Sequence, residues 1–591
     1  MFLLLDYKEY YGIDKSFSDA IDLIKDIPSV TLLNYIAGFG VNLYLHENTE
    51  HTGKIQFMLV NSLLGKCDQA IQQKWANEVK KQAEKGHSPI LFWTYSNLLF
   101  YGLIFKTINN KPSRDLTSEE AIRVFDVYLI INGIANDKVQ IETETIEKAD
   151  REEKIEDVML PSFIYQKDYV STVDFSNQVT RGVTFFNYLE NDPKYKTLVK
   201  EYYESKNVSG SLRMFKNLMV IFSEINLGKD LDRRNQLANL KEYFIGSEVD
   251  LDYIETLCIN PEISSYKEDV SFGSLRSKFL YKLNKFQFLI LDVNFLIDQF
   301  YKAQIFSFNA FLKSKKIKGD FLSEKGKNFT ENIYLPLVLD TCFSHYFKFY
   351  GDNCKNSNNE ELCDAYLREE NKICLIEFKD ILLNASIKNS AEQEELFAEF
   401  DKKFVSNQTG KPKGITQLLN AIKDIDANSI SFDSSVPKSE IEIYPVIVYT
   451  DLSFGTEGIN KIFKDKFRVE INKLHLQNII VKDVTFINLN FLEIREDYFA
   501  KKLLNLFVML DGYIEHIKDP NYLLTPFEVF SRFYMNMYVP EELGATSSYL
   551  KHQHNIVTAK KWKIQLVTLN IKQQKSRFIF LTLRAITPNG F

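Results

Sequence analysis

The sequence predicts a mostly helical protein that also contains an α/β domain. Apolar residues recur at three- and four-residue spacing through roughly the first 280 residues, as they do in amphipathic helices. β-rich runs such as 373–378 and 441–449 are concentrated further along the chain. The segment 551–591 holds two more β-like runs and no acidic residue. We therefore expect a large helical N-terminal region, an α/β core, and a C-terminal helix followed by a basic β-hairpin.

The chain has 591 residues, which is too long for one ordinary hydrophobic core and indicates about two to four domains. The pattern changes near residue 285, so we expect a helical region at 1–284, the α/β domain at 285–500 and the C-terminal helix and hairpin at 501–591. The acidic segment 138–158 divides the helical region in two, as a solvated helix or a linker.

Composition narrows the class of protein. With 45% hydrophobic and 26% charged residues the chain has an ordinary globular composition, and its net charge of −7 gives no overall signature of nucleic-acid binding. The six cysteines form no CxxC pair, which suits a reducing compartment. Neither a signal-peptide pattern nor an apolar run of about 20 residues is present. We expect a cytoplasmic protein that does not enter a membrane.

The N-terminal region carries helical patterns and no recognisable chemistry. Segments 17–27 and 67–85 are amphipathic, 90–105 is a dense apolar run, and 117–120 (TSEE) is typical of a helix start. Because no catalytic set appears here, we expect this region to regulate or recruit. It offers a surface for a protein partner or for self-association.

The most informative stretch is 361–380 (ELCDAYLREENKICLIEFKD). Two apolar runs flank a charged, Asn-containing turn, which predicts a β-hairpin. Asp364 opens the first strand, and Glu377 and Lys379 close the second on one face, because side chains two apart point the same way. Two carboxylates and an ammonium would then converge at one end of an apolar hairpin. Buried charge needs a partner, and a divalent metal ion would supply one.

Four segments together resemble the PD-(D/E)xK, or restriction-endonuclease-like, nuclease superfamily. They are a helix at 331–350, the hairpin at 364–379, a helix at 415–425 and a strand at 444–449. The signature would be Asp364 with Glu377-Phe378-Lys379, and the resemblance covers about 326–490. It implies a restriction-endonuclease-like α/β core. Two departures are Cys363, where the signature has proline, and the polar segment 351–361, which leaves the preceding strand short, displaced or absent.

The resemblance also implies the chemistry. Asp364, Glu377 and the backbone carbonyl of Phe378 would hold Mg²⁺ or Mn²⁺, and Lys379 would orient the attacking water and stabilise developing charge. Glu331 on the first helix and Gln417 on the second fit ancillary positions of the same site.

Each of these residues also has a simpler interpretation. The hairpin can end in an ordinary Glu–Lys pair with Asp364 capping a turn, Glu331 can be an acid near a helix N-terminus, and Gln417 can be solvent-exposed. Asp380 faces the other side of the strand from Lys379 and is interpreted as a solubilising charge at the strand end.

The C-terminal tail is basic in an acidic protein. Its runs 562–571 and 578–583 predict a hairpin that carries aromatic and basic side chains. Such residues suit phosphate neutralisation and base stacking, and lysine also keeps an edge hairpin soluble. The candidate nucleic-acid-binding residues are Lys560, Lys561, Lys563, Lys572, Lys575 and Arg577.

We therefore expect a Mg²⁺-dependent nuclease that hydrolyses phosphodiester bonds, in DNA ahead of RNA. Defence against foreign DNA would suit a chain that joins a helical sensor to a nuclease, by analogy of fold. The alternative is a helical interaction or nucleic-acid-binding protein whose nuclease-like domain is inactive.

Overall fold

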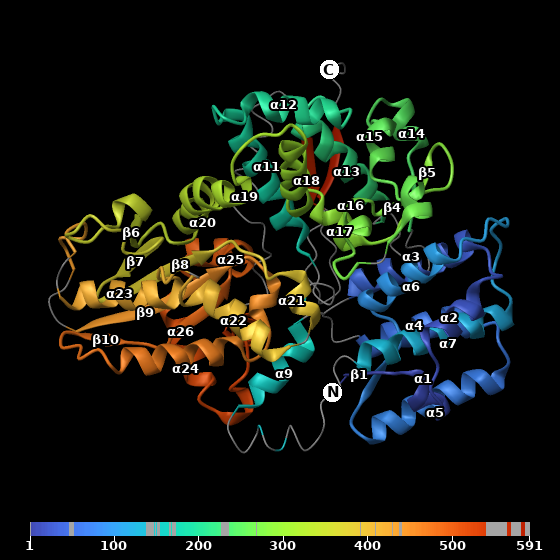
Figure 1. The fold of residues 1–591 in the computed structure, drawn as a ribbon, viewed down its shortest axis with the longest axis horizontal. Coiled ribbons are helices and arrows are strands. Elements are labelled where there is room, and N and C mark those ends of the chain that lie inside the picture. The colour runs from blue at the N-terminus through green and yellow to red at the C-terminus, as the bar shows by residue number, and fades with distance from the viewer. Residues whose placement is uncertain are drawn as a thin grey trace. The chain divides into compact units, whose positions relative to one another are not determined.

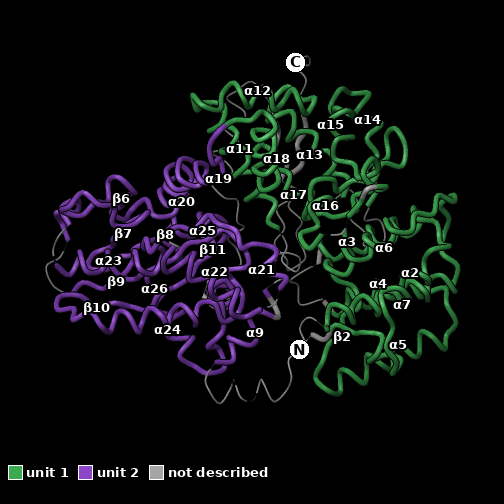
Figure 2. Tube along the Cα trace, viewed as in Figure 1, with its two compact units in different colours: residues 1–140, 169–317 green, residues 141–168, 318–591 purple. Residues whose placement is uncertain are grey.

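The computed structural model describes 2–46, 52–137, 147, 149, 154–164, 167, 173–225, 236–267, 269–390, 392–407, 409–427, 430–436, 440–538, 564–568 and 581–585. The chain forms two compact units (Figures 1 and 2). Unit 1 comprises Met1–Gln140 and Tyr169–Ile317, and unit 2 comprises Ile141–Asp168 and Lys318–Phe591. The expected combination of a mostly helical protein with an α/β region is confirmed.

Unit 1 is built almost entirely of helices. Its helices are α1 (Tyr7–Tyr11), α2 (Phe17–Ile24), α3 (Ser29–His46), α4 (Thr52–Leu64), α5 (Gln69–Glu84), α6 (Thr94–Lys106), α7 (Ser118–Asp137), α11 (Phe175–Asn191), α12 (Lys196–Ser205), α13 (Ser211–Ile225), α14 (Lys241–Ile245), α15 (Leu251–Thr256), η2 (Asn260–Ser265), α16 (Gly273–Ser277), α17 (Val293–Asp298) and α18 (Lys302–Ser314). The predicted start of α7 is a capping box: Glu120 N donates to Thr117 Oγ1 at 3.2 Å and Thr117 N to Glu120 Oε2 at 2.9 Å.

Unit 1 extends beyond the boundary expected at residue 285. Its strands are β1 (Phe2–Leu4), β2 (Ser88–Ile90), β3 (Leu237–Asn239), β4 (Leu280–Lys282) and β5 (Gln287–Ile290). The last of these, β5, pairs antiparallel with both β3 and β4, and the Tyr101 hydroxyl donates to the carbonyl of Leu291 at 2.8 Å. Tyr202 on α12 donates to Gln304 on α18 at 2.6 Å. These contacts place 285–317 in unit 1 and put the change of unit at Lys318.

Unit 2 combines a mixed β-sheet with helices. Its elements are α9 (Ile155–Ile164), α19 (Phe321–Glu324), the π-helical η3 (Lys325–Tyr334), α20 (Leu335–Cys342), β6 (Phe347–Tyr350), η4 (Gly351–Asn353), β7 (Ala365–Glu369), β8 (Lys372–Lys379), α21 (Ala385–Ser390), α22 (Gln393–Phe404), α23 (Gly414–Asp426), β9 (Ile441–Tyr449), η5 (Leu452–Gly455), α24 (Ile459–Ile471), β10 (Ile479–Val481), β11 (Thr485–Asn488), α25 (Leu489–Ala500), α26 (Leu506–His516), η6 (Pro520–Tyr522), α27 (Phe527–Tyr538), β12 (Ile564–Thr568) and β13 (Leu581–Ala585). Strands β12 and β13 pair antiparallel, as expected of a hairpin in the tail.

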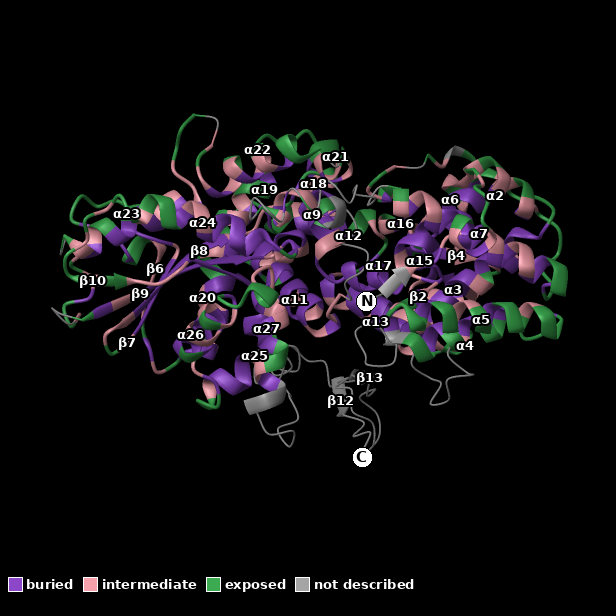
Figure 3. Ribbon diagram, turned by 90° about the horizontal axis from the view of Figure 1, so that it is seen from below, coloured by how far each residue is buried: buried purple, intermediate pink, exposed green. Residues whose placement is uncertain are grey.

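The main sheet of unit 2 has the order β10-β9-β8-β7-β6, and β11 also pairs with β9. Strand β7 pairs antiparallel with both β6 and β8, whereas β8 and β9 run parallel. Alternate residues of β8 face opposite layers of helices. Ile373 and Leu375 join the core formed with α22, α23 and α24, while on the other face Tyr444 of β9 packs its ring on Phe507 of α26, with the ring centroids 5.0 Å apart. Figure 3 shows that β8 and β9 are largely buried between these layers.

Pro445 lies inside this sheet, although proline in the run 441–449 suggested an edge strand or an irregular start. Strand β9 pairs with β8 along its length, whereas on its other side β10 pairs with Ile441–Ile443 and β11 begins opposite Val446. The carbonyl of Ile443 accepts a hydrogen bond from Lys482 N, on the side of β9 that faces β10 and β11. The odd-numbered residues of β9 therefore direct their N–H and C=O groups to this side. The missing N–H of Pro445 therefore faces the gap between β10 and β11, where no ladder bond is lost.

The strand before the hairpin is present, but earlier than the polar segment 351–361. The helix expected at 331–350 ends at Cys342, and Phe347–Tyr350 form β6, antiparallel to β7. The sequence FKFY satisfies both a helical stripe and strand alternation, so its pairing with β7 decides its state.

An N-terminal segment is part of unit 2. The segment 138–158, expected to be a solvated helix or a linker, lies mostly outside the described residues. Helix α9 begins at the end of that segment and continues past it, and its Leu160 and Ile164 are fully buried in the core with α22 and α24. Glu156 accepts from Lys461 at 2.6 Å, and both side chains are almost completely buried. Gly458 has a positive φ of 93°, and a Cβ there would approach the Cβ of Glu156 to 2.8 Å, so glycine allows the close packing of α9.

Candidate functional site

The end of the β7–β8 hairpin brings the expected signature residues together. The register pairs Ala365 with Ile376, so one step further along the hairpin Asp364 lies beside Glu377. The Asp364 carboxylate accepts a hydrogen bond from the backbone N–H of Phe378 at 2.6 Å. This bond fixes Asp364 across the strand end, since a charged acceptor strengthens the bond.

Glu377 and Lys379 point to the same face and form an ion pair. The Lys379 ammonium donates to Glu377 Oε2 at 2.8 Å, and Glu377 is 1% exposed. Lys379 Nζ also lies 3.4 Å from Oε1 of Gln417 on α23, and that oxygen accepts from Gly414 N at 2.9 Å. The structure therefore places Gln417 against Lys379, as well as at the first turn of its own helix.

The electrostatics of the cluster are dominated by crowded carboxylates. Burial and the negative charge of Asp364 raise the pKa of Glu377 from 4.5 to about 8, although Lys379 opposes the shift. Burial and Asp364 likewise raise the pKa of Glu331, half-buried on η3, from 4.5 to about 7. Burial alone would lower the pKa of Lys379, but Glu377 and Asp364 raise it above its ordinary value. The cluster holds more negative charge than Lys379 can balance.

Two further charged residues belong to this neighbourhood and were not singled out from the sequence. Desolvation and Asp364 raise the pKa of Glu361, which opens the same 361–380 stretch. Lys413 directly precedes α23, and desolvation together with the charge of Lys379 lowers its pKa. Glu361 could have been identified from the sequence, because it lies only three residues before Asp364. Lys413 could not, because its closeness to the cluster depends on how α23 packs on β8.

Asp380 does not serve as a solubilising charge at the strand end. Its carboxylate is ion-paired with Lys325 and accepts hydrogen bonds from Thr330 Oγ1 at 2.7 Å and Thr450 Oγ1 at 2.9 Å. Burial would raise the pKa of Asp380, but Lys325 and the two hydroxyls lower it below its ordinary value. The interpretation of Asp380 as a solubilising charge is wrong, because the local sequence around Asp380 does not reveal its contact with η3, which supplies both Lys325 and Thr330.

The donor groups of the cluster fit a magnesium or manganese ion. Among the described residues, no three His, Cys, Asp or Glu side chains converge closely enough to enclose a metal ion. Mg²⁺, however, keeps several waters and takes only one or two carboxylates. Asp364 and Glu377 meet that need, with the carbonyl of Phe378 as a third donor. A cation would also offset the burial and the repulsion from Asp364, which together raise the pKa of Glu377.

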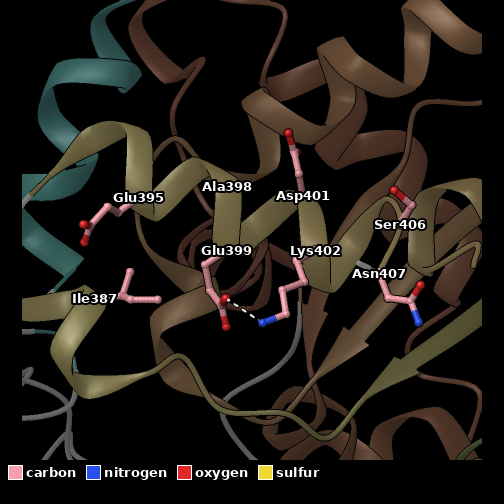
Figure 4. Close-up of a pocket in the computed structure, with 8 residues that line it drawn as sticks. All are labelled: Ile387, Glu395, Ala398, Glu399, Asp401, Lys402, Ser406 and Asn407. Atoms are coloured by element: carbon pink, nitrogen blue, oxygen red, sulfur yellow. Dashed lines mark ion pairs between the residues drawn. The ribbon is translucent and has the colours of Figure 1, made fainter. Parts of the chain in front are cut away.

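A surface hollow of about 520 Å³ lies elsewhere in unit 2 (Figure 4). Its lining comes from α21, α22 and the turn after α22: Ile387, Glu395, Ala398, Glu399, Asp401, Lys402, Ser406 and Asn407. Glu399 and Lys402 pair across 3.5 Å, and no residue of the carboxylate cluster lines the hollow. It is therefore separate from the candidate site.

The other expectations concern the tail, the thiols and the membrane. The six basic candidates from Lys560 to Arg577 lie outside the described residues. All six cysteines are free and buried. Within the described ranges, no helix combines the length and the apolar character needed to cross a bilayer.

Comparison with known proteins identifies no relative. No family model, curated protein or solved structure matches the chain. A function for the carboxylate–lysine cluster must therefore be inferred from its own geometry and chemistry.

Proposed function

We propose that the protein is a metal-dependent nuclease that hydrolyses phosphodiester bonds, with DNA favoured over RNA. The observation that carries the proposal is the meeting of Asp364, Glu377 and Lys379 at one end of a buried hairpin. An isolated Glu–Lys pair would explain two of these residues. It does not explain a second carboxylate bonded across the same strand end and a third, Glu331, within its electrostatic reach.

The order of elements in unit 2 supports the same proposal. Helix α20 is followed by the antiparallel strands β6, β7 and β8, then by α21, α22 and α23, and then by β9, which runs parallel to β8. The resemblance to PD-(D/E)xK nucleases implies a helix, a strand before the acidic hairpin, a second helix and a further strand in this sequence. The acidic hairpin occupies the middle of that series.

The cluster can supply what phosphodiester hydrolysis requires. When bound by Asp364, Glu377 and the Phe378 carbonyl, a divalent ion would polarise the phosphate and lower the pKa of a coordinated water. The Lys379 ammonium would donate to the attacking water and to the charge that develops on phosphate oxygens. Gln417 would keep the Lys379 side chain aimed at that position, through the contact at 3.4 Å.

The test is a cleavage assay with matched variants. Purified protein is incubated with Mg²⁺ or Mn²⁺ and with plasmid, single-stranded DNA or RNA, and EDTA serves as the control. We expect metal-dependent cleavage that is lost in Glu377→Ala. Lys482→Ala is the matched control, because Lys482 pairs with Glu442 and Asp511 outside the cluster. A folded protein that cuts none of these substrates would refute the nuclease and favour an inactive, binding domain.

The remaining parts of the proposal concern context. The helical unit 1 would recruit a partner or a second copy, and the basic tail would contact nucleic acid. Six free, buried cysteines suit the reducing cytoplasm, where a nuclease could act against foreign DNA.

A further inference from the structure

A buried ion-pair network joins the strand that carries Lys379 to the helix that carries Glu331. Asp380 directly follows Lys379 at the end of β8, and its carboxylate is bonded to Lys325 and Thr330, both on η3. Thr330 immediately precedes Glu331 in sequence, and Lys325 begins the same π-helical segment. A third bond, from Thr450 at 2.9 Å, holds Asp380 at the end of β9. We call Asp380, Lys325, Thr330 and Thr450 the Asp380 network.

The network is well placed to hold η3 in its unusual form. A π-helix is rarer and less favourable than an α-helix and is found mostly at functional sites, so a ten-residue segment needs tertiary support. Lys325 and Thr330 are 5% and 2% exposed, so their bonds to Asp380 are formed away from bulk water. A buried, charged acceptor with three partners is a stronger anchor than a surface pair.

Asp380 acts from behind the cluster. Successive side chains on a strand point to opposite faces, so Asp380 faces away from Lys379 and Glu377. Its hydrogen-bond partners are Lys325, Thr330 and Thr450, not residues of the cluster. Its carboxylate can influence the chemistry through Thr330, whose neighbour Glu331 interacts electrostatically with Asp364 and Lys379, and also through the direct effect of its own charge on Glu331.

We infer that Asp380 is a positioning residue, which fixes η3 so that Glu331 is held beside Asp364, Glu377 and Lys379. The inference rests on the proposed nuclease function, because it gives Glu331 a place in that site. A purely structural role would make Asp380 important for stability alone. A positioning role also makes it important for turnover in a protein that remains folded.

Two variants weaken the network to different degrees. Asp380→Asn removes the charge that pairs with Lys325 but keeps an oxygen acceptor and nearly the same volume. Thr330→Val removes one hydroxyl and its bond to Asp380 without changing the shape of the side chain. The matched control is Thr341→Val on α20. It also removes one partly buried hydrogen bond, which the Thr341 hydroxyl donates to the carbonyl of Leu337 at 2.8 Å, but this bond lies outside the Asp380 network.

Cleavage rates and a double-mutant cycle measure the positioning role. We expect kcat to fall at least tenfold in Asp380→Asn and severalfold in Thr330→Val, since small misplacements of reacting groups are costly. Thr341→Val should cut at the wild-type rate. In a Glu331→Gln background, Thr330→Val should add little further loss, because the Glu331 carboxylate that Thr330 would position is already absent. Full additivity, or wild-type rates in folded Asp380→Asn, would overturn the inference.

Hydrogen exchange gives a readout that does not require cleavage. Amides of 325–334 should exchange at least tenfold faster in Asp380→Asn than in wild type, while those of β9 stay protected. Unchanged exchange in η3 would overturn the inference whatever the rates show. If the wild-type protein cuts no substrate, the nuclease function fails separately. Mn²⁺ affinity by calorimetry then replaces kcat: a severalfold loss in both network variants supports positioning, and unchanged affinity refutes it.

Discussion

Glu377→Gln should stabilise the metal-free protein above neutral pH. Burial and Asp364 raise the pKa of Glu377 from 4.5 to about 8, so the folded state binds this proton more tightly than the unfolded state. The stabilisation linked to that proton is complete below pH 4.5 and is lost as the pH rises through about 8. Glutamine keeps the size of the side chain and an oxygen for Lys379, but it has no charge to bury.

The size of the effect follows from how far the pH lies above 4.5, the pKa of Glu377 in the unfolded chain. One pKa unit corresponds to about 1.4 kcal/mol, so the interval from 4.5 to pH 7 amounts to about 3 kcal/mol of lost stability in the wild type. The variant and the wild type should therefore be similarly stable near pH 5. In EDTA the variant should be more stable by about 3 kcal/mol at pH 7 and by about 4–5 kcal/mol at pH 8.

Urea titrations read by hydrogen exchange of the β8 peptide would measure this difference within unit 2 alone. Adding Mg²⁺ should narrow the gap at pH 8, because an ion that binds only the folded wild type stabilises it by mass action. The reasoning is refuted if the difference between variant and wild type is the same at pH 5 and pH 8. Glu377 would then be ionised throughout, with its charge fully balanced by Lys379.

Three further outcomes are expected. Lys379→Ala should lower the cleavage rate on the order of a hundredfold, or about 3 kcal/mol, while nucleic-acid binding measured by anisotropy persists; an unaltered rate would make the Glu–Lys spacing coincidental. Neutralising Lys560, Lys561 and Lys563 in the tail should weaken nucleic-acid binding equally for all nucleotide sequences and flatten the plot of log affinity against log salt. An unchanged slope would assign the tail to packing or solubility instead. Leu160→Ala should destabilise unit 2 by about 2–5 kcal/mol in the same urea assay, whereas Val469→Ala on exposed surface should have little effect; equal effects would mean that α9 is not part of this core.

Local patterns in the sequence predicted the hairpin and much of its surroundings. The alternation and turn in 361–380 gave β7 and β8, and the apolar spacing in 415–425 gave α23, because each pattern is satisfied within a few residues. The convergence of Asp364, Glu377 and Lys379 followed from strand periodicity together with the antiparallel pairing of the hairpin. Their catalytic roles remain predictions.

Features that depend on distant partners were not predictable in this way. The state of 347–350 depends on pairing with β7, and the tolerance of Pro445 depends on the gap between β10 and β11. The role of Asp380 depends on Lys325, 55 positions earlier, which no local pattern connects to it. Tertiary contacts of this kind override short-range preference.

The position of α9 in the chain has a consequence during protein synthesis. Leu160 and Ile164 leave the ribosome long before their partners, since α24 ends at Ile471. At about 5–20 residues per second, this apolar surface waits roughly 15–60 s for its core. During that interval the apolar surface would be accessible to chaperones, and a nascent chain that stops before α24 would leave it covered by α22 but not by α24.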